Sequence, residues 1–389
     1  MNLPYTVPSD AEKTALWKAY YDRRPIRVPL RWNANIRHVL LDPDLNPEGW
    51  TFEDYVFDPD RHIAIRIRFQ EIQRTTFSQV SDMPAALPEE WVCAPDVQNT
   101  YDALYFGARL SLKPGQVPAA EPCYGIGDVD RFLAMDFSNP LANPFIQERL
   151  AFEEKLMRAA RGRFYLGRPV RACPFTLGFD GPVTAAAALF GTDFFILFGE
   201  DPAKASRVLD KITREVLRRN KTLLRRAGKS ERPSHGFLAD DSIQLIGLDT
   251  YRQWVLPVHR IYYEEMFDAP FGTRGIHLCG DATRHFRTIR DELGVSSFDT
   301  GFPVDHGALR RELGPDVEIS GGPPVPLLRS GSPAECAAET LRILRSGIME
   351  GGRFILQEGN NLSPCTPLVN MAAVYHTCLL HGLYSRASA

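Results

Sequence analysis

The segment Arg274-Gly275-Ile276-His277-Leu278-Cys279-Gly280 is the most informative part of this chain. Its first residues are typical of a short buried strand, and Gly280-Asp281 is typical of the turn that ends one. Because side chains alternate along a strand, His277 and Cys279 are expected to point the same way from its carboxyl end. An imidazole and a thiol are ligands of the kind that zinc prefers. Two ligands do not complete a metal site, so other parts of the chain have to supply the rest.

Seven further segments have the composition of short strands, and they alternate with amphipathic helices. This alternation is typical of βα units and a parallel sheet. Eight strands are the number of a TIM barrel, so we predict an α/β fold, a (β/α)8 TIM barrel. The eight predicted strands are Ile26–Trp32, Trp91–Pro95, Val170–Phe175, Gly236–Ala239, Arg274–Cys279, Val295–Phe298, Val317–Ser320 and Arg353–Gln357.

Three helix starts have clear capping patterns. Asp201-Pro202 combines a preferred N-cap residue with a proline at the first helical position. Ser332, followed three residues later by Glu335, forms a capping box. Thr366-Pro367 opens the last predicted helix.

The first 145 residues have a less regular pattern. Residues 33–90 and 108–145 contain much of the proline and many aromatic residues, with few periodic apolar runs. We interpret them as long N-terminal insertions that cap one end of a single barrel domain spanning residues 1–389. The alternative is a separate small N-terminal domain, because 389 residues would on length alone suggest more than one domain.

Composition argues against several classes of protein. The net charge is −3 and no basic block occurs, so we expect no nucleic-acid partner. The most apolar stretch, residues 185–198, is short and contains Gly191 and Asp193, so we expect no membrane span. The start of the chain has no secretion-signal pattern, and the seven cysteines are scattered. These features favour reduced thiols and a cytoplasmic location, and a homodimer is the default expectation.

Five landmarks follow one another in the second part of the chain. They are Gly181-Pro182-Val183-Thr184, Asp240-Asp241, His277-Leu278-Cys279-Gly280, Ser320-Gly321-Gly322-Pro323-Pro324 and the segment from Gly359 to Asn370. In these residues and in their order, the chain from about Arg168 onward resembles the uroporphyrinogen decarboxylase superfamily. That superfamily includes the decarboxylase and the zinc methyltransferases that act on methyl-corrinoids. The resemblance implies a (β/α)8 barrel with its active site at the carboxyl ends of the strands.

The resemblance also separates the two branches of the superfamily. It places Gln98 where the decarboxylase carries a catalytic Asp, and it places Ala188 near the position of a catalytic Tyr. An amide and a methyl group cannot act as the proton donor and the carboxylate that decarboxylation requires. The chain therefore resembles the methyltransferase branch more closely.

For the methyltransferase branch, the resemblance implies that His277 and Cys279 are zinc ligands. The third ligand of that branch is a Cys, but this chain has Asn360 at the corresponding position. A neutral amide is a poor ligand for zinc. Cys365 lies five residues further on, near the start of a helix, and it is either the replacement ligand or an inert packed cysteine.

Other polar residues follow the predicted strands on the face where barrel enzymes place catalytic groups. Asp240 and Asp241 follow the fourth strand, and Asp299 follows the sixth. Each is a candidate for catalysis. Asp240 and Asp241 could act as a general base or as a further metal ligand, although one of the two could instead cap the following helix. Asp299 or Asp281 could fix the orientation of His277. The candidates for substrate binding are Gln98, Asn360, Gly321 and Gly322. A glycine at such a position permits close approach of a ligand to the backbone, or only a tight turn.

Three functions are consistent with these observations. The one we favour is a zinc-assisted methyltransferase that moves a methyl group between a corrinoid and a thiol or similar acceptor. Zinc would be held by His277, Cys279 and Cys365, with the corrinoid as co-substrate and a corrinoid protein as a possible partner. The alternatives are a tetrapyrrole-binding enzyme of the decarboxylase type and a non-catalytic barrel that binds a small ligand. The main support for the non-catalytic alternative is Asn360.

Overall fold

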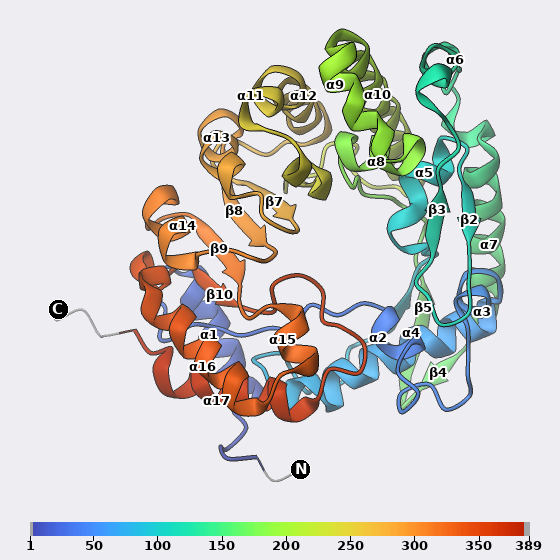
Figure 1. Ribbon diagram of the computed structural model, residues 1–389. Coiled ribbons are helices and arrows are strands. Elements are labelled where there is room, and N and C mark those ends of the chain that lie inside the picture. Colours follow the sequence, from blue (N-terminus) through green and yellow to red (C-terminus); the bar gives the residue numbers. More distant parts are fainter. Residues whose placement is uncertain (1–2, 385–389) are drawn as a thin grey trace.

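The computed structural model describes residues 3–384, so residues 1 and 2 of the chain start considered above lie outside it. Figure 1 shows strands on the inside of a ring and helices on the outside. Five parallel strands form the larger sheet in the order β10-β9-β8-β7-β6. They are β6 (Phe237–Ala239), β7 (Arg274–Leu278), β8 (Val295–Thr300), β9 (Glu318–Gly321) and β10 (Phe354–Leu356). This is the parallel α/β architecture that the sequence predicts.

The remaining strands of the described residues form two smaller sheets. β1 (Trp91–Cys93) and β5 (Arg168–Ala172) form a parallel pair, and β4 (Phe164–Tyr165) adds to β5 in the antiparallel direction. β2 (Arg109–Ser111) and β3 (Ala119–Glu121) form an antiparallel hairpin. Seven of the eight predicted strands therefore coincide with strands of the structure.

The first predicted strand, Ile26–Trp32, forms only isolated bridges. Arg27 pairs with Leu383, and Leu30 pairs in parallel with Leu356 of β10. Pro25 and Pro29 explain the difference, because proline has no N–H to donate to a regular ladder. The segment still lies beside β10, where the first strand of a barrel belongs.

The predicted helix starts are confirmed. α10 (Pro202–Arg226) begins after Asp201, whose side chain accepts the Lys204 N–H at 2.9 Å. α16 (Pro333–Ile343) has the predicted capping box of Ser332 and Glu335, and α17 (Leu368–His381) follows Thr366-Pro367. The other α-helices are α1 (Asp10–Tyr21), α2 (Arg37–Leu40), α3 (Phe52–Phe57), α4 (Pro59–Thr75), α5 (Tyr101–Tyr105), α6 (Val129–Ala134), α7 (Pro144–Ala160), α8 (Pro182–Phe190), α9 (Leu197–Glu200), α11 (Leu248–Thr250), α12 (Leu256–Met266), α13 (Thr283–Leu293), α14 (His306–Leu313) and α15 (Val325–Ser330).

The region 33–90 is more regular than its sequence suggests. It contains α4, a helix of 17 residues that packs against β1 and α7. Its apolar residues are buried on two sides: Ile63 and Ile67 belong to a small cluster with Trp91 and Cys93 of β1, whereas Ile65 and Phe69 belong to the larger hydrophobic cluster of the protein. A helix buried on two sides has no single apolar stripe, so its periodicity is easily missed. Whether these residues and 108–145 are insertions into one domain remains a prediction.

The larger of the two hydrophobic clusters contains residues from Val28 to Cys378. On β7 and β8, the buried side chains of Ile276, Leu278 and Phe298 face the helices. The alternate residues of the same strands therefore face the barrel axis.

No single described helix is long and apolar enough to cross a membrane. Among the described residues, α8 and residues 192–200 reach that length and hydropathy only when taken together, and they are bent by 119° relative to each other.

Candidate active site

The strand β7 brings His277 and Cys279 together as predicted. His277 Nε2 lies 3.0 Å from Cys279 Sγ, because the two residues are alternate positions at the carboxyl end of one strand. On the neighbouring strands, Ala239 and Asp299 are in register with His277. The pair therefore lies at the barrel mouth, the end of the barrel where the parallel strands have their carboxyl ends.

Asp299 orients the imidazole of His277. Its Oδ2 lies 2.8 Å from His277 Nδ1, so Nε2 is left to face Cys279. The other carboxylate oxygen accepts a hydrogen bond from Gln357 Nε2, and Gln357 Oε1 in turn accepts one from Arg31 Nε at 3.0 Å. Such a chain fixes the ring and its tautomer, as is usual for metal-binding histidines. Between the two predicted partners of His277, the structure selects Asp299; Gln357 and Arg31 were not singled out in the sequence, although Gln357 ends a predicted strand.

Asp241 completes the group around the thiol. Its Oδ1 accepts the Cys279 N–H at 2.7 Å and lies 3.8 Å from His277 Nε2. One ligand atom each from Asp241, His277 and Cys279 lie within 4.8 Å of one another. The Cys279 thiol also donates to Asn360 Oδ1 at 3.1 Å. Nitrogen, sulfur and oxygen donors thus converge on one point, which is a donor set that suits zinc.

The electrostatics of this group favour a shared proton or a bound cation. Burial lowers the pKa of His277, but the hydrogen bonds and charges of Asp299 and Cys279 outweigh this and raise its pKa to about 11. Burial raises the pKa of Cys279, and the contact with His277 only partly reverses that shift. These shifts favour a positive charge between the imidazole and the thiol, which is where a metal ion would bind both atoms.

Asp240 has a different environment from its neighbour. It is fully buried and accepts hydrogen bonds from Thr184 N at 2.8 Å, Val183 N at 3.2 Å and the Thr184 hydroxyl at 2.8 Å. His259 Nε2 lies 2.9 Å from its second oxygen. Asp240 therefore ties the first turn of α8 to β6, and the structure does not bring it to the group around Cys279. The capping alternative describes this residue better than the predicted catalytic role, although the helix it holds precedes it in the chain.

The structure does not bring Cys365 to the group either. Its thiol is directed at the carbonyl oxygen of Leu41, 3.6 Å away, and the cluster of possible ligands among the described residues contains Asp241 in its place. Gly321 and Gly322 are close-packing positions rather than contacts for a ligand. A methyl group at Gly321 would collide with the Thr300 hydroxyl, and one at Gly322 with the backbone carbonyl of Gln357.

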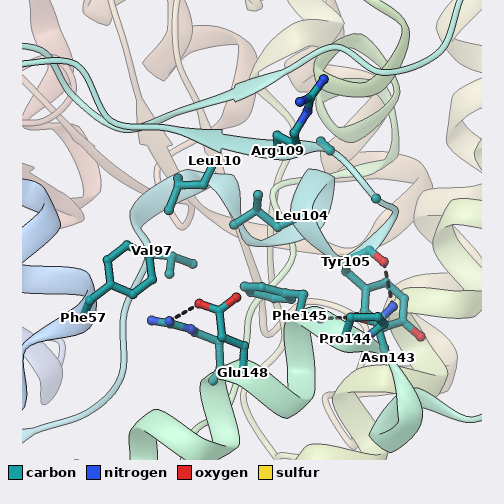
Figure 2. Close-up of a pocket in the computed structure, with 13 residues that line it drawn as sticks. Phe57, Val97, Leu104, Tyr105, Arg109, Leu110, Asn143, Pro144, Phe145 and Glu148 are labelled. Atoms are coloured by element: carbon teal, nitrogen blue, oxygen red, sulfur yellow. Dashed lines mark hydrogen bonds and ion pairs between the residues drawn. The ribbon is translucent and has the colours of Figure 1, made fainter.

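A cavity of about 910 Å³ opens beside this group, and His277, Asp299, Ser320 and Asn360 are among its lining residues. Its other end reaches Phe237, at the start of β6. A second cavity of about 370 Å³, shown in Figure 2, lies between α5, β2 and α7, and its lining includes none of the predicted site residues. The barrel cavity is therefore the one associated with the candidate site.

Several known proteins resemble this chain over a large part of its length. The family model "Uroporphyrinogen decarboxylase (URO-D)" matches residues 107–379. A methylated-thiol–coenzyme M methyltransferase of Methanosarcina mazei is 30% identical over 321 residues, which cover 77% of this chain and 76% of that protein. A methylcobamide:CoM methyltransferase of Methanosarcina acetivorans is 26% identical over 130 residues, 33% of this chain and 36% of that protein.

A solved structure, a methyltransferase from Methanosarcina mazei, superposes with a TM-score of 0.63 at 16% identity and covers 95% of this chain and 98% of that one. It supports the fold, and together with the family model it confirms the predicted TIM barrel. The order of landmarks, the group at the end of β7 and the extent of the match lead to one conclusion: the chain belongs to the uroporphyrinogen decarboxylase family.

Proposed function

We propose that this methyltransferase of the decarboxylase family moves a methyl group between a corrinoid and a thiol or similar acceptor, with zinc at the end of β7. The observation that carries the proposal is the convergence of His277 Nε2, Cys279 Sγ and Asp241 Oδ1 within 4.8 Å. The names of two relatives, which mention a methylated thiol, a methylcobamide and coenzyme M, support the thiol and the corrinoid.

The residues present fit a catalytic zinc site. His277, Cys279 and Asp241 would supply three protein ligands and leave a fourth position for substrate, as catalytic zinc requires. In this ligand set Asp241 contributes the negative charge that Asn360 lacks, so Cys365 is not needed. Bound there, zinc would act as a Lewis acid that keeps a substrate thiol in its nucleophilic thiolate form.

The protein's own residues would hold the geometry of this reaction. Asp299 keeps Nε2 of His277 directed at the site, and Asp241 accepts the Cys279 N–H and so positions the thiol. Glu358 is fully buried, and both of its oxygens accept the Asn33 N–H at 3.1 Å. Burial raises the pKa of Glu358 well above its usual value. The hydrogen bonds between Asn33 and Glu358 hold the loop that carries Asn360 against the segment that follows residues 26–32.

Metal analysis tests the zinc site directly. The purified protein is expected to contain about one zinc per chain, and Cys279→Ser, His277→Ala and Asp241→Asn should each reduce zinc content. Cys365→Ser is the matched control, because its thiol faces the Leu41 carbonyl. A full zinc content in Cys279→Ser, or its loss in Cys365→Ser, would show that the metal is bound elsewhere.

Methyl transfer tests the reaction itself. The zinc-loaded protein is mixed with methylcobalamin and a panel of thiols, and the loss of the methylcobalamin spectrum is followed. We expect transfer that depends on Cys279. Zinc-loaded protein that transfers no methyl group to any thiol would instead support the non-catalytic barrel.

The partners and setting belong to the same proposal. A small-molecule thiol and a corrinoid protein are the proposed partners, and a cytoplasmic homodimer is the proposed assembly. Sedimentation of the purified chain, alone and with a corrinoid protein, checks both associations.

A further inference from the structure

The interior of this barrel differs from that of most TIM barrels, which fill the space along the axis with layers of branched apolar side chains. On the four neighbouring strands β6 to β9, the residues Leu238, Ile276, Phe298 and Ile319 belong to the larger hydrophobic cluster. Because side chains alternate along a strand, the residues on either side of these four point to the opposite face, toward the barrel axis.

The strand register arranges these axis-facing residues in two layers. The layer nearer the amino ends of the strands, the amino-side layer, consists of Phe237, Gly275, Ser297 and Glu318. The layer nearer the mouth consists of Ala239, His277, Asp299 and Ser320. Apart from Phe237, each member is a polar residue, an alanine or a glycine. Residues of these kinds do not make a packed apolar core, so the two layers leave space along the axis.

The cavity of about 910 Å³ beside the candidate site occupies this space. Its lining includes Ser297 and Glu318 of the amino-side layer, and it reaches Tyr21 and His235 beyond that layer. Tyr21 and His235 are exposed to solvent, and so is Asn361, which lines the cavity at the mouth. The cavity therefore extends along the barrel and has solvent-exposed side chains at both ends.

The acidic group of the amino-side layer is already neutralised. Glu318 forms an ion pair with Arg353 at 2.8 Å, and it accepts hydrogen bonds from Ser297 Oγ at 3.0 Å and from the Tyr20 hydroxyl at 2.9 Å. Such groups still offer hydrogen bonds to water. An ion that passed this layer would instead lose hydration without meeting an unpaired counter-charge in it. The amino-side layer therefore suits the passage of water and of small uncharged molecules.

Phe237 narrows the opening at the amino end of the barrel. Its exposed ring lies against Gly275, where an added Cβ would be 3.0 Å from Phe237 Cδ2. The ring also stacks on that of His235, with 6.5 Å between the ring centroids and 19° between the planes. A smaller residue at this position would widen the opening without touching the group around Cys279.

We infer that the barrel interior is a channel, through which water and small uncharged molecules reach Cys279 from the amino end of the barrel as well as from the mouth. The channel itself does not depend on the proposed function, whereas its use in turnover rests on it. When a substrate thiol becomes a thiolate beside Cys279 and a corrinoid protein covers the mouth, the thiol proton leaves through the water of this channel.

A thiol introduced into the amino-side layer tests the channel. The metal-free Ser297→Cys variant is treated with methyl methanethiosulfonate, a small uncharged reagent that transfers a methylthio group to a thiol and releases methanesulfinate. Peptide mass spectrometry then gives the rate at each cysteine, with the fully buried Cys378 as internal control. The introduced thiol should react at least about a hundredfold faster than Cys378, because an enclosed thiol reacts only when the core opens.

Two further substitutions in the Ser297→Cys background identify the direction of entry. Phe237→Ala widens the amino-end opening and should speed labelling of the introduced thiol severalfold. Ala239→Leu fills the layer nearer the mouth and should leave that rate unchanged. The anionic reagent (2-sulfonatoethyl) methanethiosulfonate should label the introduced thiol more slowly than the methyl reagent does, when each rate is divided by that of the partly exposed Cys123.

Labelling of the introduced thiol no faster than that of Cys378 in folded protein would overturn the inference. A rate that Ala239→Leu lowers and Phe237→Ala leaves unchanged would also overturn it, because entry would then be from the mouth. Equal relative rates for the anionic and uncharged reagents would refute the proposed selectivity. If Ser297→Cys does not fold, Phe237→Ala in the otherwise unchanged chain should speed labelling of Cys279, and an unchanged rate there overturns the inference.

The proposed function fails separately from the channel. If the introduced thiol is labelled from the amino end but no thiol accepts a methyl group, methyl transfer is refuted and the channel stands. If methyl transfer occurs but the introduced thiol stays unlabelled in folded protein, the channel alone is refuted.

Discussion

Asp240 and Asp241 are adjacent in the chain, and we predict opposite consequences of replacing them. Asp240→Asn should destabilise the fold without removing the zinc ligands. Asp241→Asn should reduce zinc affinity at least about tenfold, because the amide is a much poorer ligand than the carboxylate. The same variant should leave the fold nearly as stable as before. The contrast follows from their surroundings: Asp240 is fully buried, whereas about a third of the Asp241 side chain is exposed.

The magnitude for Asp240 follows from its contacts. An asparagine can keep the acceptor that Thr184 uses, but its amino group would face the Val183 N–H and His259 Nε2. The variant loses one hydrogen bond to a charged group, about 1.5–3 kcal/mol, and leaves a buried backbone N–H unpaired, about 1–3 kcal/mol. We therefore expect the free energy of unfolding to fall by roughly 2.5–6 kcal/mol. For Asp241→Asn, which retains an acceptor for the Cys279 N–H, we expect a loss under about 1 kcal/mol.

Urea denaturation followed by circular dichroism measures both changes on metal-free protein, and zinc affinity is measured by competition with a chelator. The reasoning is refuted if Asp240→Asn lies within about 1 kcal/mol of the parent, or if Asp241→Asn is the more destabilised of the two. A folded Asp240→Asn protein that no longer binds zinc would contradict the structural role given to Asp240.

Three further predictions concern the same end of the barrel. Gly322→Ala should cost about 1–3 kcal/mol, because the added methyl group meets the Gln357 carbonyl, whereas Gly247→Ala, which meets nothing within 4 Å, should leave the melting temperature unchanged. Asn360→Cys should raise zinc affinity more than about tenfold in chelator competition, since it adds a thiolate next to Cys279; an unchanged affinity would place the metal elsewhere. Burial raises the pKa of Asp180 from 3.8 to about 8, so unfolding releases its proton and the stability of the parent falls as pH rises between those values. Asp180→Asn has no such proton to release, so its melting temperature should rise relative to that of the parent as pH increases across this range. A constant difference between the two melting temperatures would contradict the shift.

Local sequence patterns were sufficient for much of the fold. The alternation of strand residues predicted that His277 and Cys279 share one side, and the 3.0 Å contact confirms it. The caps at Asp201 and Ser332 were predicted because capping involves residues two or three positions apart. These predictions succeed because every group they involve lies within one strand or one helical turn.

The composition of the site depended on contacts between distant segments. Asp241 reaches Cys279 across 38 residues of chain, and Asn360 reaches it across 81. No local rule distinguishes Asp241 from Asp240, or indicates that the Cys365 thiol faces Leu41. The sequence by itself determined which strand carries the imidazole and thiol, because that follows from backbone geometry. Only the tertiary structure decided which carboxylate joins them, because that depends on how neighbouring βα units pack around the barrel.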